Sequence, residues 1–220
     1  MFDFLGYDLL GAFWVTVQLA GYSALGALIW GTLLAGMRVC PVPLMRGFGT
    51  SYVNVVQNIP LTVIMVFSSL GLFQTMGIAL GASDFTDINF RLAVLSLAGY
   101  TAAFVCEALR SGINTVPVGQ AEAARALGLS FTQVLRLIVL PQAFRAVVSP
   151  LTNVLIALTK NTTVAAVIGV AEAAALMKDM IEAKAETVLI SAVFALGFVC
   201  LTLPTGLILG WVSKKVAVKR

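Results

Sequence analysis

The sequence has 220 residues, of which 60% are hydrophobic and 11% are charged, and its mean hydropathy is +0.99. Soluble domains contain about 45–50% apolar and about 25% charged residues, so this composition excludes an ordinary soluble protein as well as a disordered chain. The sequence contains no histidine, which excludes histidine-based triads and metal sites, and its net charge of +4 fits orientation in a bilayer better than nucleic-acid binding.

Five stretches of low charge are long enough to cross a membrane, since about 20 apolar residues span about 30 Å of hydrocarbon. They predict transmembrane helices at 9–37, 60–80, 92–113, 147–170 and 187–213. The expected fold class is therefore an all-α integral membrane protein with a single transmembrane domain over residues 1–220. The first stretch is too long for a cleavable signal peptide, and acidic residues precede it where a signal peptide has basic ones.

Polar residues mark the edges of the second and third stretches. Asn58 and Pro60 stand at the head of the second, where they either begin a helix or contribute to a ligand site. Glu107 and Arg110 are three residues apart near the end of the third, so they share a helix face and are expected to neutralise each other.

The longest polar segment, 114–144, predicts two short helices joined by a glycine. Thr115 is expected to cap the first helix and Pro117 to occupy its first turn. Four alanines between 121 and 126 favour that helix, and Gly128 suits the left-handed residue that ends it.

The second short helix of this segment begins with a capping box. Ser130 and Gln133 have the spacing that satisfies two backbone donors at once. Pro141 is expected to stop the helix after Leu140. The segment therefore either joins two spans as a structured loop or docks a cytoplasmic partner.

Seven residues of this segment match the spacing EAA-x3-G-x9-I-x-LP: Glu122, Ala123, Ala124, Gly128, Ile138, Leu140 and Pro141. This pattern resembles the cytoplasmic loop of ABC importer permeases. The similarity continues over about residues 11–211, and stretches such as Gln57–Leu61 and Leu151–Asn153 resemble the polar amino-acid subfamily, which imports histidine, glutamine, glutamate or arginine.

The resemblance implies a type I importer permease, a multi-pass protein of the bacterial inner membrane. Two permease subunits, identical or homologous, would enclose the pathway, with an ATPase dimer beneath them and an extracytoplasmic binding protein outside. The chain lacks the Gly-x4-Gly-Lys-Ser/Thr phosphate loop, so ATP and Mg²⁺ would be bound by the ATPase, and no enzyme activity or cofactor is expected here. The motif residues, with Arg125 and Leu127, would contact that ATPase.

Lys160 lies near the middle of the apolar stretch Pro150–Gly169, where a charge costs roughly 3 kcal/mol. Asn161, Thr162 and Thr163 follow it, so the stretch is expected to line a hydrated pathway or to break the helix. Alternatively, Lys160 pairs with Glu107. A lysine beside Asn161 favours an acidic or neutral amino acid, which makes glutamate the leading substrate and glutamine the second.

Beyond this stretch, residues 172–186 form a charged segment that either receives a binding protein or is simply solvated. The charged residues of the whole chain predict its orientation, with the N-terminus outside and the C-terminus inside. One set of connections carries most of the basic residues: Arg38, Arg46, Arg110, Arg125, Arg136, Arg145, Lys214, Lys215, Lys219 and Arg220. The other set carries acidic residues: Asp3, Asp8, Asp84, Asp87, Glu172, Asp179, Glu182 and Glu186.

Two other classes of protein fit the pattern less well. A secondary transporter or channel driven by an ion gradient is the main alternative, but such carriers often have ten or more spans and an internal repeat, whereas five spans and no repeat are found here. A membrane enzyme would need a nucleophile with a base, or a metal cluster, and the three widely separated cysteines behave as small hydrophobic residues.

Overall fold

The computed structural model of the chain describes residues 6–216, apart from the side chains at 209, 212–214 and 216. The described residues are helical throughout, with short connections and no strand. The elements are α1 Leu9–Val39, α2 Pro43–Asn58, α3 Leu61–Val66, η1 Phe67–Thr75, α4 Phe85–Ile113, α5 Val118–Ala126, α6 Phe131–Val134, η2 Leu135–Val139, α7 Leu140–Asn161, η3 Thr162–Ile168, α8 Ala173–Lys184 and α9 Thr187–Val216.

Four helical stretches of the described chain are long and apolar enough to span a membrane: α1, α4, the continuous run Phe131–Ile168, and α9. A fifth candidate is the pair formed by α2 with α3 and η1, which is bent by 102°. The prediction of an all-α integral membrane protein is confirmed at four or five spans. The span expected at 60–80 differs most, because its helix ends at Thr75 and forms one arm of the bent pair.

The bend follows from the residues at its corner. Asn58 ends α2, and Ile59 and Pro60 are both extended before α3 begins. Proline has no N–H and disfavours helix in the residue before it, so the hydrogen-bond ladder stops here. Pro60 therefore stands at the start of a helix, as one of the two alternatives predicted. The same prediction is wrong for Asn58, which ends a helix.

Helix α4 is the centre of the bundle, with α1, α2 and α7 packed around it. Gly31 of α1 permits the closest approach, since a Cβ there would lie 2.6 Å from the Val105 Cβ and 2.8 Å from the Ala102 carbonyl oxygen. Small residues allow membrane helices to pack at such short range. Leu34 and Cys106 are fully buried in the same α1–α4 contact.

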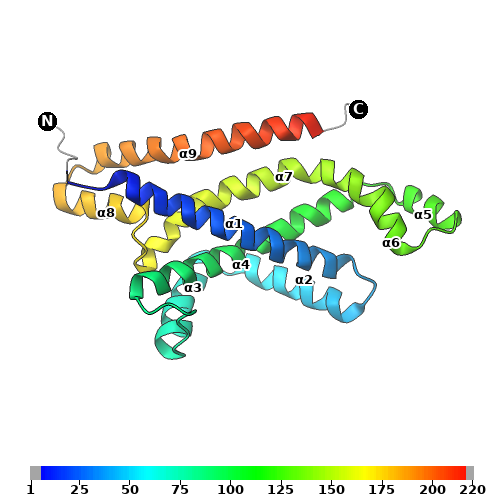
Figure 1. Cartoon of the computed structure of the whole chain (residues 1–220), viewed down its shortest axis with the longest axis horizontal. Helices are drawn as coiled ribbons and strands as arrows, with labels where there is room; N and C mark the ends of the chain where they lie inside the picture. The colour runs from blue at the N-terminus through cyan, green and yellow to red at the C-terminus, as the bar shows by residue number, and fades with distance from the viewer. Residues whose placement is uncertain (1–5, 217–220) are drawn as a thin grey trace.

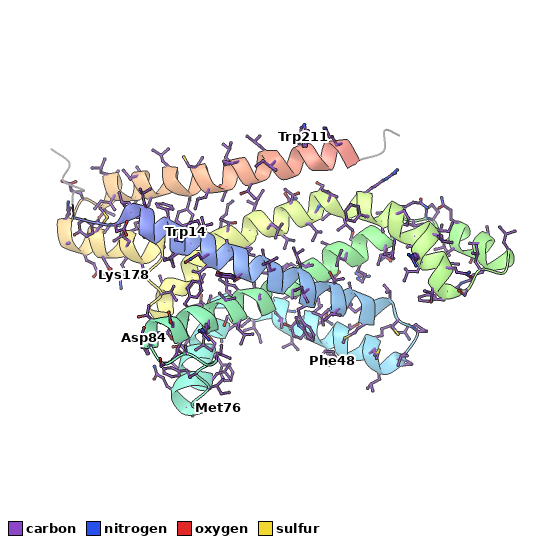
Figure 2. The ribbon with its side chains drawn as sticks, in the orientation of Figure 1. Trp14, Phe48, Met76, Asp84, Lys178 and Trp211 are labelled. Carbon is purple, nitrogen blue, oxygen red and sulfur yellow. The ribbon has the colours of Figure 1, made fainter. Side chains whose placement is uncertain are left out.

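Different elements form the two ends of the molecule (Figure 1). The start of α1, α8 and the start of α9 lie at one end, whereas α5 and α6 lie at the opposite end. The arginines at 125, 136 and 145 therefore lie toward the α5 end, and Lys178 and Asp84 lie toward the α8 end (Figure 2). Of the residues used for the orientation, Asp3, Lys219 and Arg220 fall outside the described residues.

Helix α8 is anchored to α1 by a buried carboxylate. Glu172 is fully buried and caps α8, because its Oε1 atom accepts a hydrogen bond from the Ala175 N–H at 3.0 Å. The Thr16 hydroxyl of α1 lies 3.4 Å from Oε2 of Glu172 and accepts from the Ala173 N–H at 3.1 Å. Burial raises the pKa of the Glu172 carboxyl, while these hydrogen bonds oppose the rise.

Candidate functional site

The loop helices α5 and α6 meet at Gly128, as predicted. Gly128 has φ +85°, a left-handed backbone conformation that residues with a Cβ rarely adopt. The N–H of Leu129 then donates to the Ala124 carbonyl oxygen at 3.2 Å, which closes the end of α5. The capping box is confirmed, since the Ser130 N–H donates to Gln133 Oε1 at 2.8 Å and the Gln133 N–H donates to Ser130 Oγ at 3.4 Å.

Two other local expectations for this loop are wrong. Thr115 does not cap α5, because its hydroxyl donates to the Gly112 carbonyl at the end of α4, and the cap position is Pro117. Pro141 does not stop the second helix, which continues to Ile168. The turns of η2 widen to the π form just before Pro141, which accommodates a residue that donates no backbone hydrogen bond.

The motif residues present a mixed surface at this end of the molecule. Glu122, Ala123 and Arg125 are exposed on α5, and Leu127 is 83% exposed despite its hydrophobic side chain. Ala124 is different, because it is only 5% exposed. We call the surface formed by these exposed side chains the loop surface. It also includes Leu140 and Pro141 at the start of α7, and the half-buried Ile138 between α6 and α7.

A hydrogen bond fixes the loop surface to the long helix. Gln142 donates through Nε2 to Gln120 Oε1 at 2.7 Å and to the Ile138 carbonyl at 2.9 Å. Gln120 lies on α5 and Gln142 on α7, so this hydrogen bond joins α5 to the helical run Phe131–Ile168, which is a candidate membrane span.

The polar stretch at Lys160 does not break the helix. The chain changes from α to 3₁₀ geometry at Thr162 and stays helical until Gly169, whose φ is +81°. The hydroxyls of Thr162 and Thr163 donate to the carbonyls of Thr159 and Lys160, at 2.7 Å and 2.8 Å. The predicted discontinuity is therefore a tightened turn, and Lys160 itself is exposed.

A cavity of about 370 Å³ lies beside Asn161, between α4 and α7. Asn153 and Asn161 face it from α7, and Tyr100, Thr101 and Phe104 face it from α4. The Thr101 hydroxyl is buried and, among the described residues, has no hydrogen-bond partner. A buried polar group without a partner is costly, so a polar ligand or water is expected to satisfy it.

The structure separates the other expected pathway residues from this cavity. The sequence neighbours of Asn161 do not line the cavity, namely Lys160, Thr162 and Thr163. Asn58, at the end of α2, does not line it either. The Asn58 amide instead donates to the Asn54 carbonyl at 2.7 Å.

Glu107 lies in a charged cluster at the loop end of α4. It pairs with Arg110 as predicted, at 3.0 Å, and also with Arg38 of α1, a partner that the sequence interpretation missed. Both carboxylate oxygens are thus engaged, so the alternative pairing with Lys160 is wrong. Arg38 and Glu107 are 69 positions apart, so no local pattern links them. The only hint in the sequence is that Arg38 is a basic residue just after the first predicted span.

Comparison with known proteins places these features in a family. The family described as "Binding-protein-dependent transport system inner membrane component" matches residues 27–218. The chain is 56% identical to the glutamate transport system permease protein GluC of Corynebacterium efficiens, over 98% of this chain and 97% of that protein. It is 31% identical to the probable glutamine ABC transporter permease protein GlnM of Bacillus subtilis, over 93% of this chain and 91% of that protein.

A solved structure has the same fold. The structure of an amino acid ABC transporter superposes with a TM-score of 0.83 at 24% sequence identity, over 94% of this chain and 93% of that chain. At this identity the similarity establishes the fold alone.

Proposed function

The chain belongs to the family of binding-protein-dependent transport system inner membrane components, and we propose that it forms the pathway of an ABC importer for glutamate. As a member of this family it is a multi-pass inner-membrane permease that does not hydrolyse ATP, and no cofactor is expected in it. ATP and Mg²⁺ belong to the ATPase subunits, and family membership implies both an ATPase and a binding protein as partners.

The near full-length identity of 56% with GluC carries the choice of glutamate. The lining of the cavity is compatible with the same choice. Asn161 places a neutral amide in the cavity, and none of the described lining residues is acidic, so no side chain there repels the carboxylate of glutamate.

We place substrate contact at the cavity beside Asn161. Its volume of about 370 Å³ falls within the range of small-molecule sites, and its walls combine aromatic rings with a few polar groups. Thr101 lines the same cavity, and its buried hydroxyl has no hydrogen-bond partner among the described residues.

We assign ATPase coupling to the loop surface. Its exposed leucine, small side chains and opposite charges suit a groove on a partner, and the Gln120–Gln142 hydrogen bond links it to α7. With this surface in the cytoplasm, the C-terminus lies inside, the N-terminus lies outside, and α8 faces the binding protein. A second permease subunit, identical or homologous, completes the pathway.

Reconstitution into proteoliposomes tests the proposal directly. The chain, its partner permease, ATPase and binding protein should accumulate radiolabelled glutamate only with ATP on the ATPase side, and unlabelled glutamate should compete better than glutamine or arginine. Uptake by the permease alone, driven by an ion gradient, would instead support the secondary-transporter alternative. Equal uptake with and without the binding protein would also contradict the proposal.

A further inference from the structure

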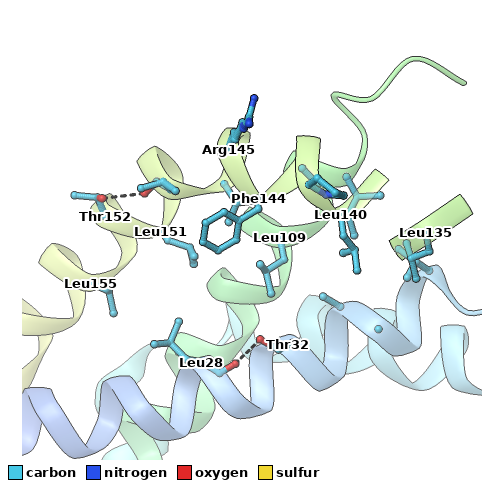
Figure 3. Close-up of a pocket in the computed structure, with 18 residues that line it drawn as sticks. Leu28, Thr32, Leu109, Leu135, Leu140, Phe144, Arg145, Leu151, Thr152 and Leu155 are labelled. Carbon is cyan, nitrogen blue, oxygen red and sulfur yellow. Dashed lines mark hydrogen bonds between the residues drawn. The ribbon is translucent and has the colours of Figure 1, made fainter. Parts of the chain in front are cut away.

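A second, larger cavity lies in the half of the bundle that carries the loop helices, and we call it the loop-end groove. It encloses about 800 Å³ between α1 and α7, with α4 as its floor (Figure 3). Its lining runs from Leu28 to Val39 on α1 and from Leu140 to Leu155 on α7, with Leu109 and Ile113 below. Asn161 and the smaller cavity do not contribute to it.

Apart from Arg145, the side chains of the groove offer no free hydrogen-bond donor to a polar solute. Besides Arg145, its only polar side chains are Thr32 and Thr152. The Thr32 hydroxyl donates to the Leu28 carbonyl at 2.6 Å, and the Thr152 hydroxyl donates to the Val148 carbonyl at 2.8 Å (Figure 3). Since both hydroxyls are satisfied by their own helices, the walls suit hydrocarbon.

The charge at the rim indicates which lipid is held. Arg145 is exposed, points away from the apolar floor, and takes part in no ion pair among the described residues (Figure 3). It stands two residues before the apolar stretch predicted to span at 147–170, so the lining residues from Val147 to Leu155 lie on its membrane side, and Leu140 and Pro141 lie on its loop side. Basic residues between transmembrane helices attract anionic headgroups.

We propose that the loop-end groove binds a phospholipid with an anionic headgroup, whose acyl chains lie between α1 and α7 and whose phosphate contacts Arg145. The site requires only that α1, α4 and α7 cross the bilayer. It does not depend on the transported substrate, so a failure of glutamate transport leaves it standing.

Native mass spectrometry of the purified full-length chain tests the headgroup. Samples carry phosphatidylglycerol and phosphatidylcholine with identical acyl chains, and the retained adducts are compared. Wild type should retain phosphatidylglycerol preferentially, and Arg145→Gln should reduce that preference about fivefold. Arg136→Gln is the matched control, because Arg136 is also exposed near the groove but does not line it. Equal retention of the two lipids by wild type, or an unchanged preference in Arg145→Gln, overturns the proposal.

A fluorescence measurement tests the acyl chains independently. Phe144 lines the groove and is 67% exposed, so Phe144→Trp places an indole there at little structural cost. Its added fluorescence should be quenched by lipids with brominated acyl chains, more strongly for brominated phosphatidylglycerol than for brominated phosphatidylcholine. Absence of quenching would show that a second protein chain covers the groove, and would contradict the proposal even if Arg145→Gln fails to fold.

Discussion

Arg38, in the last turn of α1, donates a hydrogen bond to Glu107 of α4, so the loop ends of the two central helices are joined by an ion pair. The Arg38 side chain is 11% exposed and that of Glu107 is 32% exposed. The backbone of α2 covers the pair, since a Cβ on Gly49 would lie 2.9 Å from the Arg38 Cγ. The ion pair therefore joins the loop ends of α1 and α4, and the middle of α2 packs against the Arg38 side chain.

We expect Glu107→Ala to lower stability, because it leaves a largely buried guanidinium without its carboxylate. Removing one partner of a buried pair typically costs about 3–5 kcal/mol, and the partial exposure of Glu107 reduces this to about 2 kcal/mol. For a chain of this length the inactivation midpoint should fall by about 4–8 °C. Size-exclusion chromatography after heating measures the change.

The double variant Arg38→Met/Glu107→Met separates the pair from the cost of a lone charge. It should recover most of the loss, because neither charge remains buried. Glu122→Gln serves as a control on an exposed carboxylate of α5 and should change the midpoint little. If the stability losses of Arg38→Met and Glu107→Met simply added up in the double variant, the two side chains would not interact, which would contradict the assigned contact.

We expect stability at the α8 end to depend on pH through Glu172. Its pKa is raised by burial, so the folded chain holds a proton at pH values where the unfolded chain has released it. The contribution of Glu172 is thus present in acid and is lost as the pH rises from the ordinary carboxyl range through the raised pKa. Glu172→Gln retains an acceptor for the Ala175 N–H and should remove this dependence.

Thermal inactivation between about pH 4 and about pH 8 measures the effect, since this range begins near the ordinary pKa of a carboxyl group and extends above it. Glu182→Gln is the matched control, because Glu182 is exposed on the same helix and pairs with the exposed Lys178 at 3.6 Å. Parallel profiles for wild type and Glu172→Gln would show that the buried carboxyl does not titrate within this range.

Local rules predicted the parts of the loop that depend on neighbouring residues. The turn at Gly128 and the capping box at Ser130 need only backbone preference and three-residue spacing, and both are confirmed. Pro141 shows the limit of such rules. Proline disfavours an ordinary helix interior, but the π turns of η2 relieve that conflict, and nothing in the local pattern indicates them.

The candidate site depends more on contacts between distant segments. The pattern identified Asn161 and Glu107 as unusual, but not what surrounds them. Thr101 became relevant only because α4 brings this residue to the cavity beside Asn161, and Arg38 only because α1 ends beside α4. Pairings of this kind depend on helix packing, which hydrophobic periodicity does not specify.

We expect Gly128→Val to impair coupling, because a β-branched residue is strained at φ +85°. The cost of about 1–2 kcal/mol for a left-handed conformation should shift the angle between α5 and α6. The variant should insert normally but bind less ATPase on co-purification. Gly47→Ala is the control, since a Cβ there meets nothing within 4 Å. Full ATPase binding by Gly128→Val would contradict the role of this turn.

We also expect different effects from substitutions at an exposed and at a buried position of the loop. Leu127→Ser should weaken ATPase binding without destabilising the loop, because Leu127 is 83% exposed and, under the proposed coupling, contacts the ATPase. Ala124→Glu should unfold the loop itself, because it places a charge at a position only 5% exposed. Limited proteolysis separates the two effects. Increased cleavage of Leu127→Ser would show that its side chain is structural.

We expect Asn161→Asp to change substrate selectivity. The variant adds a negative charge to a cavity whose other described lining residues are uncharged, so it should repel the side-chain carboxylate of glutamate and favour a cationic amino acid such as arginine. Glutamate uptake should fall at least tenfold, which corresponds to about 1.4 kcal/mol. Uptake is measured in proteoliposomes with the full complex, and ATPase stimulation by glutamate-loaded binding protein is measured in parallel. Asn114→Asp adds the same charge at an exposed position outside the cavity and should leave uptake unchanged. If Asn161→Asp transports glutamate at the wild-type rate, the amino acid does not pass through this cavity.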